Sequence, residues 1–111
     1  MSAAAETPSE WIDVGAADAV TESATLSTEV DGYAIVVARC GNDLFAVEDR
    51  CTHDGESLAG AEVESCEIIC PRHGARFSLR TGEALTPPAY EPVRTFNVRL
   101  MQGRILVERP A

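Results

Sequence analysis

Every histidine in this chain stands close to a cysteine. Cys51 and His53 are separated by one residue, and Cys70 and His73 by two. The chain has two histidines and four cysteines, so all of its imidazoles lie beside half of its thiols, a pattern that chance seldom produces. Thiolate sulfur and imidazole nitrogen are ligands that zinc and iron use in proteins. The two segments therefore indicate a metal site.

Three chemistries use such a set of residues. A nucleophilic cysteine–histidine pair needs one of each and leaves the second pair unexplained. A structural zinc site takes four such ligands, but its usual spacing groups two cysteines on one arm and two histidines on the other, whereas each arm here is mixed. A Rieske-type [2Fe–2S] cluster takes two cysteines on one iron and two histidines on the other, which suits two similar loops that face each other. All three remain open from the residues alone.

The spacing of the whole motif resembles one known family. Cys-x-His, 16 intervening residues and Cys-x-x-His match the two-loop signature of the Rieske [2Fe–2S] family, and the resemblance runs from Trp11 to the last hairpin. The chain is most similar to the small ferredoxins of bacterial ring-hydroxylating dioxygenases. This resemblance implies one [2Fe–2S] cluster per chain, with Cys51 and Cys70 on the inner iron and His53 and His73 on the outer iron.

Short β-branched and apolar segments at regular spacing, without a helical period, predict an all-β sandwich or barrel. The resemblance implies a Rieske-type antiparallel architecture with a smaller cluster-binding subdomain at about residues 50–85. Residues 1–9 are expected to be disordered, residues 10–111 to form a single domain, and Asp18 to Ser27 to hold a helical turn. The expected strands are an edge strand at 11–14, hairpins at 33–39 with 44–48, 61–64 with 67–70 and 94–100 with 104–107, and a further strand at 76–79.

The flanks of the motif differ from the respiratory-chain branch of the family. That branch has an extra cysteine in each loop, where Glu56 and Arg72 stand here, and these two residues could form an ion pair instead. It also has a serine and a tyrosine that donate hydrogen bonds to the cluster, where Ala75 and Phe77 stand here. Fewer hydrogen bonds stabilise the reduced cluster less, so we expect a potential near the low end of the Rieske range, roughly −150 mV.

Three further residues or segments are assigned from the same resemblance. Pro87-Pro88 resembles the third loop that shields the cluster from solvent. The hydroxyls of Thr52 and Ser78 either donate hydrogen bonds near the cluster or belong to ordinary surface loops. For Thr52 and Ser78, both of these roles remain open from the sequence.

The other two cysteines are expected to be thiols. Cys40 ends an apolar segment and is expected to be a small buried side chain. Cys66 lies in a predicted turn near Glu64 and Glu67, whose negative charge keeps a thiol protonated and unreactive. A disulfide between Cys40 and Cys66 is not expected.

The charge of the chain is −9, and it is unevenly distributed. Residues 1–67 hold 15 acids and two arginines, a net −13, while residues 68–111 hold three acids and seven arginines, a net +4. Such acidity argues against nucleic acid as a partner. It suits either a basic patch on a partner protein or a general role of the acids in keeping the protein soluble. At the histidine-bearing tip, Asp54 and Glu56 would offer negative charge to that partner, and Arg72 and Arg76 positive charge.

The resemblance implies an electron carrier and not an enzyme. A flavin-dependent ferredoxin reductase would deliver one electron, and a terminal non-haem iron oxygenase would receive it. The alternatives are the small subunit of a nitrite-reductase-like complex and, less favoured, a zinc-binding interaction module. No segment approaches the roughly 18 consecutive apolar residues of a membrane span, and the N-terminus does not read as a secretory signal. We therefore expect a cytoplasmic protein that is not bound to a membrane.

Overall fold

An antiparallel hairpin of two strands, β3 (Tyr33–Cys40) and β4 (Asp43–Glu48), lies at the centre of the molecule. The computed structural model describes residues 10–50, 57–58, 60–71, 74–87, 89 and 91–109. The turn between the two strands contains Gly41, whose φ of 64° lies in the left-handed region that glycine adopts without a steric penalty. This hairpin was predicted from the sequence and is confirmed.

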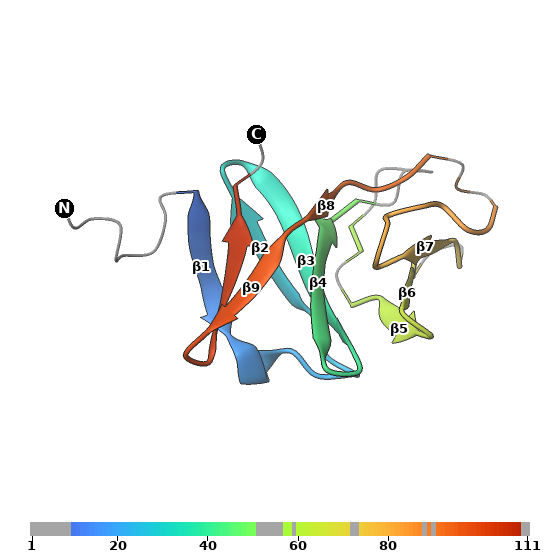
Figure 1. Ribbon diagram of the computed structural model, residues 1–111. Helices are drawn as coiled ribbons and strands as arrows, with labels where there is room; N and C mark the ends of the chain where they lie inside the picture. The colour runs from blue at the N-terminus through green and yellow to red at the C-terminus, as the bar shows by residue number, and fades with distance from the viewer. Residues whose placement is uncertain are drawn as a thin grey trace.

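The described residues form ten strands in three antiparallel sheets (Figure 1). A short 3-10 turn, η2, follows the first strand, and no described helix is long and apolar enough to cross a membrane. The predicted all-β class is therefore confirmed. The strand order of the first sheet is β1 (Trp11–Ala16), β10 (Arg104–Glu108), β9 (Val98–Met101). The order of the second sheet is β2 (Leu26–Val30), β3, β4, β8 (Thr95–Phe96). The order of the third, small sheet is β5 (Glu62–Glu64), β6 (Glu67–Ile69), β7 (Arg76–Ser78).

The middle of β3 is buried on both of its faces. Ile35 packs in one hydrophobic cluster with Ile105 of β10, between the two larger layers. The next residue, Val36, packs in a second cluster with Phe77 of the small sheet β5–β6–β7. Successive side chains of a strand point to opposite faces, so a continuous apolar run is what a strand covered on both sides requires. The β2–β3–β4–β8 sheet is thus the layer that carries the small sheet.

Strand β2 was missed by the sequence prediction. The expected helical turn between Asp18 and Ser27 is only the 3-10 turn Ala17–Ala19, and Leu26–Val30 forms a strand paired with β3. Along Leu26–Val30 the more buried and the exposed side chains alternate strictly. That period of two is the strand signal, but it is weak because polar serine, threonine and glutamate make up most of the segment.

The last predicted hairpin is divided between two sheets. Phe96 of β8 pairs with Ala46 of β4, whereas β9 pairs with β10. The break falls at Asn97, whose amide Nδ2 donates to Glu108 Oε1 at 2.7 Å and whose carbonyl accepts from the Glu108 N–H at 3.0 Å. One chain segment therefore crosses from one larger sheet to the other and joins them.

Cys40 and Cys66 form a disulfide, which contradicts the prediction that both are thiols. Cys40 is the last residue of β3, and Cys66 lies in the turn between β5 and β6. Packing of the small sheet against the central one brings their Cα atoms to 5.3 Å, inside the range that a disulfide spans. This proximity arises from tertiary packing across 26 residues and has no local sequence signal.

Candidate metal centre

Of the four predicted ligands, the structure describes one. Cys70 lies directly after β6, while Cys51, His53 and His73 are outside the described residues. Within the described part of the chain, no group of three or more metal-ligating side chains therefore comes together. What the structure does describe is how the ends of the candidate loops are held.

The second loop is closed by hydrogen bonds within itself. The Cys70 N–H donates to the Ala75 carbonyl at 2.7 Å, and the Gly74 N–H donates back to the Cys70 carbonyl at 3.0 Å. Gly74 has a φ of 75°, which permits this tight return. Cys70 is 1% exposed and forms no disulfide. A buried sulfur is thus held at the base of a short closed loop.

Asp49 closes the first loop, and sequence reasoning missed it. Its Oδ1 accepts hydrogen bonds from Ser57 Oγ at 2.9 Å and from the Leu58 N–H at 2.6 Å. Its own N–H donates to the Ala34 carbonyl of β3 at 2.9 Å. Residues 50 to 56, which include two predicted ligands, are therefore bracketed by contacts to one carboxylate. The available signal was an aspartate directly after a strand, where its side chain commonly binds nearby backbone N–H groups.

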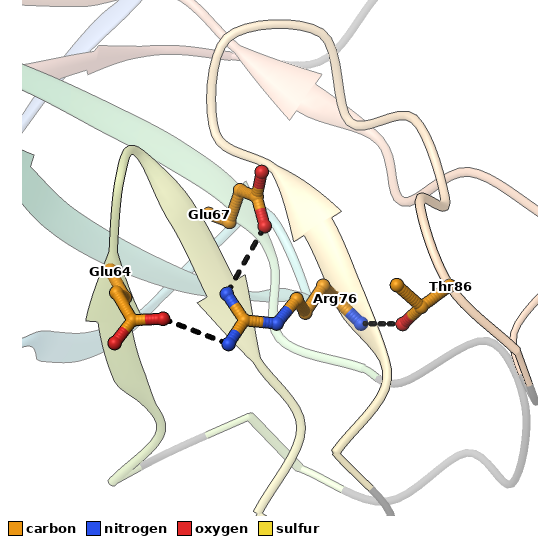
Figure 2. Close-up of polar contacts among 4 residues, drawn as sticks. All are labelled: Glu64, Glu67, Arg76 and Thr86. Carbon is orange, nitrogen blue, oxygen red and sulfur yellow. Dashed lines mark hydrogen bonds and ion pairs between the residues drawn. The ribbon is translucent and has the colours of Figure 1, made fainter.

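The third loop is attached to the second through Arg76 and Thr86. The Arg76 N–H donates to Thr86 Oγ1 at 3.0 Å (Figure 2). The Leu85 N–H donates to the Arg76 carbonyl at 2.8 Å. The Thr86 carbonyl in turn accepts from the Ala89 N–H at 3.3 Å. The turn that contains Pro87 is therefore held beside the strand that follows the second loop.

Described residues from all three loops share one hydrophobic cluster. Leu58 comes from the first loop, Cys70 and Ala75 from the second, and Ala89 from the third, and none is more than 3% exposed. They pack with Val36 of β3 and its neighbours. The ends of the three loops are therefore fixed on one face of the central sheet.

The Arg76 side chain is engaged by two carboxylates of the small sheet. Its Nη2 lies 2.8 Å from Glu64 Oε1, and its Nη1 lies 3.2 Å from Glu67 Oε1 (Figure 2). These two hydrogen bonds, the one to Glu64 first, raise the pKa of the Arg76 guanidinium. Arg76 therefore joins β7 to the β5–β6 hairpin, and the predicted positive charge for a docking partner is already matched within the chain.

The structure describes the hydrogen bonds that the Ser78 hydroxyl accepts. Its Oγ accepts hydrogen bonds from the Arg80 and Thr81 N–H groups, both at 3.2 Å, so the hydroxyl stabilises the turn after β7. Ala75 and Phe77 are fully buried and bring no hydroxyl to the second loop. Thr52, Asp54, Glu56, Arg72 and Pro88, which carried other predictions, lie outside the described residues.

Comparison with known proteins identifies the family. The model of the Rieske [2Fe-2S] domain matches residues 10–97. The chain belongs to the Rieske [2Fe–2S] domain family. The match spans the central sheet, the small sheet and all three loops. The predicted family and its iron–sulfur cofactor are therefore confirmed.

Relatives of this Rieske chain include named ferredoxins. The anthranilate 1,2-dioxygenase ferredoxin subunit of Burkholderia cepacia is 35% identical over 101 residues, 91% of this chain and 94% of that protein. The ferredoxin of carbazole 1,9a-dioxygenase from Nocardioides aromaticivorans IC177 has a TM-score of 0.86 and 31% identity, covering 92% of this chain and all of that one. These relatives are named as ferredoxin components and not as catalytic subunits, which agrees with the prediction of a carrier.

Two further solved structures bear on the alternatives. A chain from the complex of reduced oxygenase and oxidized ferredoxin in carbazole 1,9a-dioxygenase has a TM-score of 0.82 and 29% identity, covering 91% of this chain and 94% of that one. A putative NADH-dependent nitrite reductase small subunit from Mycobacterium tuberculosis has a TM-score of 0.81 at 22% identity, covering 91% and 96%. The latter likeness shows a shared fold alone.

The described part of the site fits a Rieske cluster. Cys70 offers a sulfur that no disulfide occupies, buried at the base of a closed loop. A thiolate in such an apolar position needs a metal or a cation to be stable, because burial disfavours an unpaired charge. The sequence places His73 three positions later, so this loop carries the mixed pair that a Rieske centre takes from each side.

Proposed function

We propose that this chain carries single electrons on a low-potential Rieske [2Fe–2S] cluster, from a flavin-dependent reductase to a terminal non-haem iron oxygenase. The proposed ligands are Cys51 and Cys70 on one iron and His53 and His73 on the other. One observation carries most weight: the closed loop that holds Cys70, which is buried and in no disulfide, lies inside the segment matched to the Rieske domain.

The chain's own residues hold this site rather than transform a substrate. When bound, the cluster accepts and gives up one electron. Asp49 and the Cys70–Ala75 hydrogen bond hold the ends of two loops, and Thr86 holds the third beside them. Loops fixed in this way limit reorganisation when the charge of the centre changes. Such a site needs no substrate pocket.

The low potential follows from what surrounds the second loop. Buried Ala75 and Phe77 cannot donate side-chain hydrogen bonds to a cluster sulfur. Without such donors the more negative reduced state is less stabilised, so we expect a potential near the low end of the Rieske range, roughly −150 mV.

The proposed partners follow from the relatives. The dioxygenase ferredoxin seen in a complex with its oxygenase is similar to this chain over nine-tenths of its length. We therefore propose docking through the histidine-bearing tip, with Asp54, Glu56 and Arg72 as its charged residues. Arg76 is left out because Glu64 and Glu67 already match its charge.

We further propose that residues 10–111 act as one domain in the cytoplasm, with residues 50–85 as its cluster-binding subdomain. The alternative, a nitrite-reductase small subunit, is less favoured because that likeness rests on 22% identity, whereas the relatives named as ferredoxins are 35% and 31% identical. A zinc-binding module is disfavoured by the same family match.

The optical and EPR spectra of the purified protein test the proposal directly. We expect a coloured protein with about two iron and two sulfide per chain and, after dithionite reduction, a Rieske EPR signal. A colourless protein that contains zinc would overturn the cluster assignment. Reduced protein that never reoxidises in the presence of a ring-hydroxylating oxygenase would leave the cluster in place but overturn the carrier role.

A further inference from the structure

The Cys40–Cys66 disulfide is a covalent link between the central sheet and the small sheet that carries Cys70. We propose that this disulfide is a site of thiol–disulfide exchange that takes an external thiol as its reductant, and that its redox state sets how firmly the small sheet retains the [2Fe–2S] cluster. Neither part depends on the partner proteins proposed above.

The disulfide is accessible to an attacking thiol. Cys40 and Cys66 are both partly exposed, whereas Cys70 is buried. The two sulfur-bearing residues line a surface hollow of about 240 Å³ together with Arg39 and Ser65. Exchange requires an in-line approach of a thiolate to one of the two sulfurs, and exposed disulfides are the labile ones. An external thiol therefore reaches this pair before it reaches the thiol at the loop base.

Arg80 makes Cys66 the better leaving sulfur. Its guanidinium Nη2 lies 3.6 Å from Cys66 Sγ, and its Cζ lies 5.4 Å from the centre of the Phe45 ring, which keeps the cation in place. A nearby cation stabilises a departing thiolate, while the negative charges of Glu64 and Glu67 on either side of this turn are bound by Arg76. The arrangement therefore directs attack to Cys40 and release of Cys66.

The turn that carries Cys66 holds its backbone in a conformation that side chains with a Cβ rarely adopt. Ser65 and Cys66 have φ values of 53° and 62°, in the left-handed region. Two-residue hairpin turns of this kind usually contain Asn-Gly, because side chains with a Cβ are strained there. The pairing of Glu64 with Glu67 and the hydrogen bond from the Leu79 N–H to the Cys66 carbonyl hold this turn in both redox states, so Cys66 stays in place for the reverse reaction.

The exchange balances in atoms and electrons. A thiolate of the reductant attacks Cys40 Sγ, forms a mixed disulfide with it and expels Cys66 as a thiolate. A second thiol then attacks the reductant sulfur that is bonded to Cys40, and Cys40 leaves as a thiolate. The reductant is oxidised to a disulfide by two electrons, and the protein gains two thiols. A disulfide such as oxidised glutathione reverses the reaction.

Reduction removes the one covalent tie that the described residues show between the two sheets. Packing across β3 and the hydrogen bond from the Leu79 N–H to the Cys66 carbonyl at 3.0 Å remain. Because Cys70 follows β6 of the same small sheet, looser anchoring of that sheet exposes the loop base more often. We therefore expect the cluster to be lost several-fold faster from the reduced form.

The purified holoprotein tests the exchange. It is equilibrated in glutathione buffers of increasing reducing power, labelled with a maleimide and weighed intact, while visible absorbance follows the cluster. We expect two labels per chain to appear reversibly while the cluster absorbance is retained. The exchange is refuted if no label enters before the absorbance is lost, or if both cysteines label in every buffer.

Variants test the link to the cluster and the part played by Arg80. The variants Cys40→Ser and Cys66→Ser should lose the cluster several-fold faster than oxidised wild type. Their rate of cluster loss should be the same in every buffer. If the cluster in both variants has the wild-type half-life, the disulfide does not anchor the small sheet. Arg80→Gln should slow exchange several-fold, because the departing Cys66 thiolate loses its neighbouring cation. Arg94→Gln, which alters an arginine stacked over Tyr33 and Phe96 instead, should leave the exchange rate unchanged. Equal rates in both arginine variants would remove Arg80 from the site.

Discussion

Thr86 Oγ1 accepts a hydrogen bond of 3.0 Å from the backbone N–H of Arg76. Arg76 begins β7, directly after the loop that holds Cys70, and Thr86 precedes the turn at Pro87. This one contact therefore joins the second loop of the site to the third. The guanidinium of the same arginine binds Glu64 and Glu67 (Figure 2). The main chain of Arg76 therefore contacts the third loop, while its side chain contacts β5 and β6.

Replacing Thr86 by valine should loosen the third loop. The Arg76 N–H loses its acceptor, which costs about 1 kcal/mol of unfolding free energy. Cluster absorbance should decay faster than in wild type during incubation with a chelator. Thr86→Ser retains the hydroxyl and is the matched control. Equal decay rates for the valine and serine variants would refute this role.

Replacing Gly82 by alanine should destabilise the fold strongly. Gly82 has a φ of 80°, and a Cβ there would overlap the carbonyl oxygen of Val93, whose N–H donates to the Gly82 carbonyl at 2.8 Å. We expect a loss of at least about 2 kcal/mol in denaturant unfolding. Gly103→Ala is the control, since Gly103 has a φ of 79° with open space around it. A loss in Gly82→Ala no larger than in the control would mean that the overlap is relieved.

Replacing His73 by cysteine should lower the reduction potential. All-thiolate ligation favours the oxidised cluster, and plant-type ferredoxins with four cysteines lie near about −400 mV. We expect a variant that retains some cluster to shift in that direction in a redox titration. An unchanged potential and an unchanged EPR signal would argue against His73 as a ligand.

Adding donors beside the second loop should raise the potential. Ala75→Ser and Phe77→Tyr each introduce a hydroxyl at a fully buried position, and a hydrogen bond to the cluster stabilises its reduced state. Phe96→Tyr places the same hydroxyl in the other hydrophobic cluster and is the control. A wild-type potential above zero, or equal potentials in all variants, would contradict the account of the low potential.

The ion pair between Asp13 and Arg104 should make stability depend on pH at the acid end. A hydrogen bond from Arg104, at 3.0 Å, lowers the pKa of Asp13 below its ordinary 3.8. Because the folded pKa is the lower one, the pair stabilises the fold above pH 3.8 and loses its effect as the pH falls through the folded value.

Thermal melts of Asp13→Asn test this. The variant should melt below wild type at neutral pH, and the difference should vanish in acid and shrink in high salt. Asp18→Asn, at an exposed aspartate of the 3-10 turn, serves as the control. A difference that stays constant from neutral to strongly acid pH would show that the carboxylate charge is not the cause.

Local patterns in the sequence were sufficient for the elements whose partners are close in the chain. The hairpin of β3 and β4 and the β5–β6 turn follow from apolar runs on either side of short turns, because neighbouring strands close at little entropic cost. The motif around Cys51, His53, Cys70 and His73 was likewise sufficient to predict the family, since ligand spacing is a local property.

Contacts between distant segments were decided only by the tertiary structure. Asn97 divides one apolar segment between two sheets, because each half finds a different partner strand. Arg76 binds two carboxylates because the fold places it between Glu64 and Glu67. Cys40 and Cys66 became a disulfide because two sheets pack together. The periodicity of the sequence does not predict these contacts. They depend on how whole sheets pack together and not on the residues next to each contact in the chain.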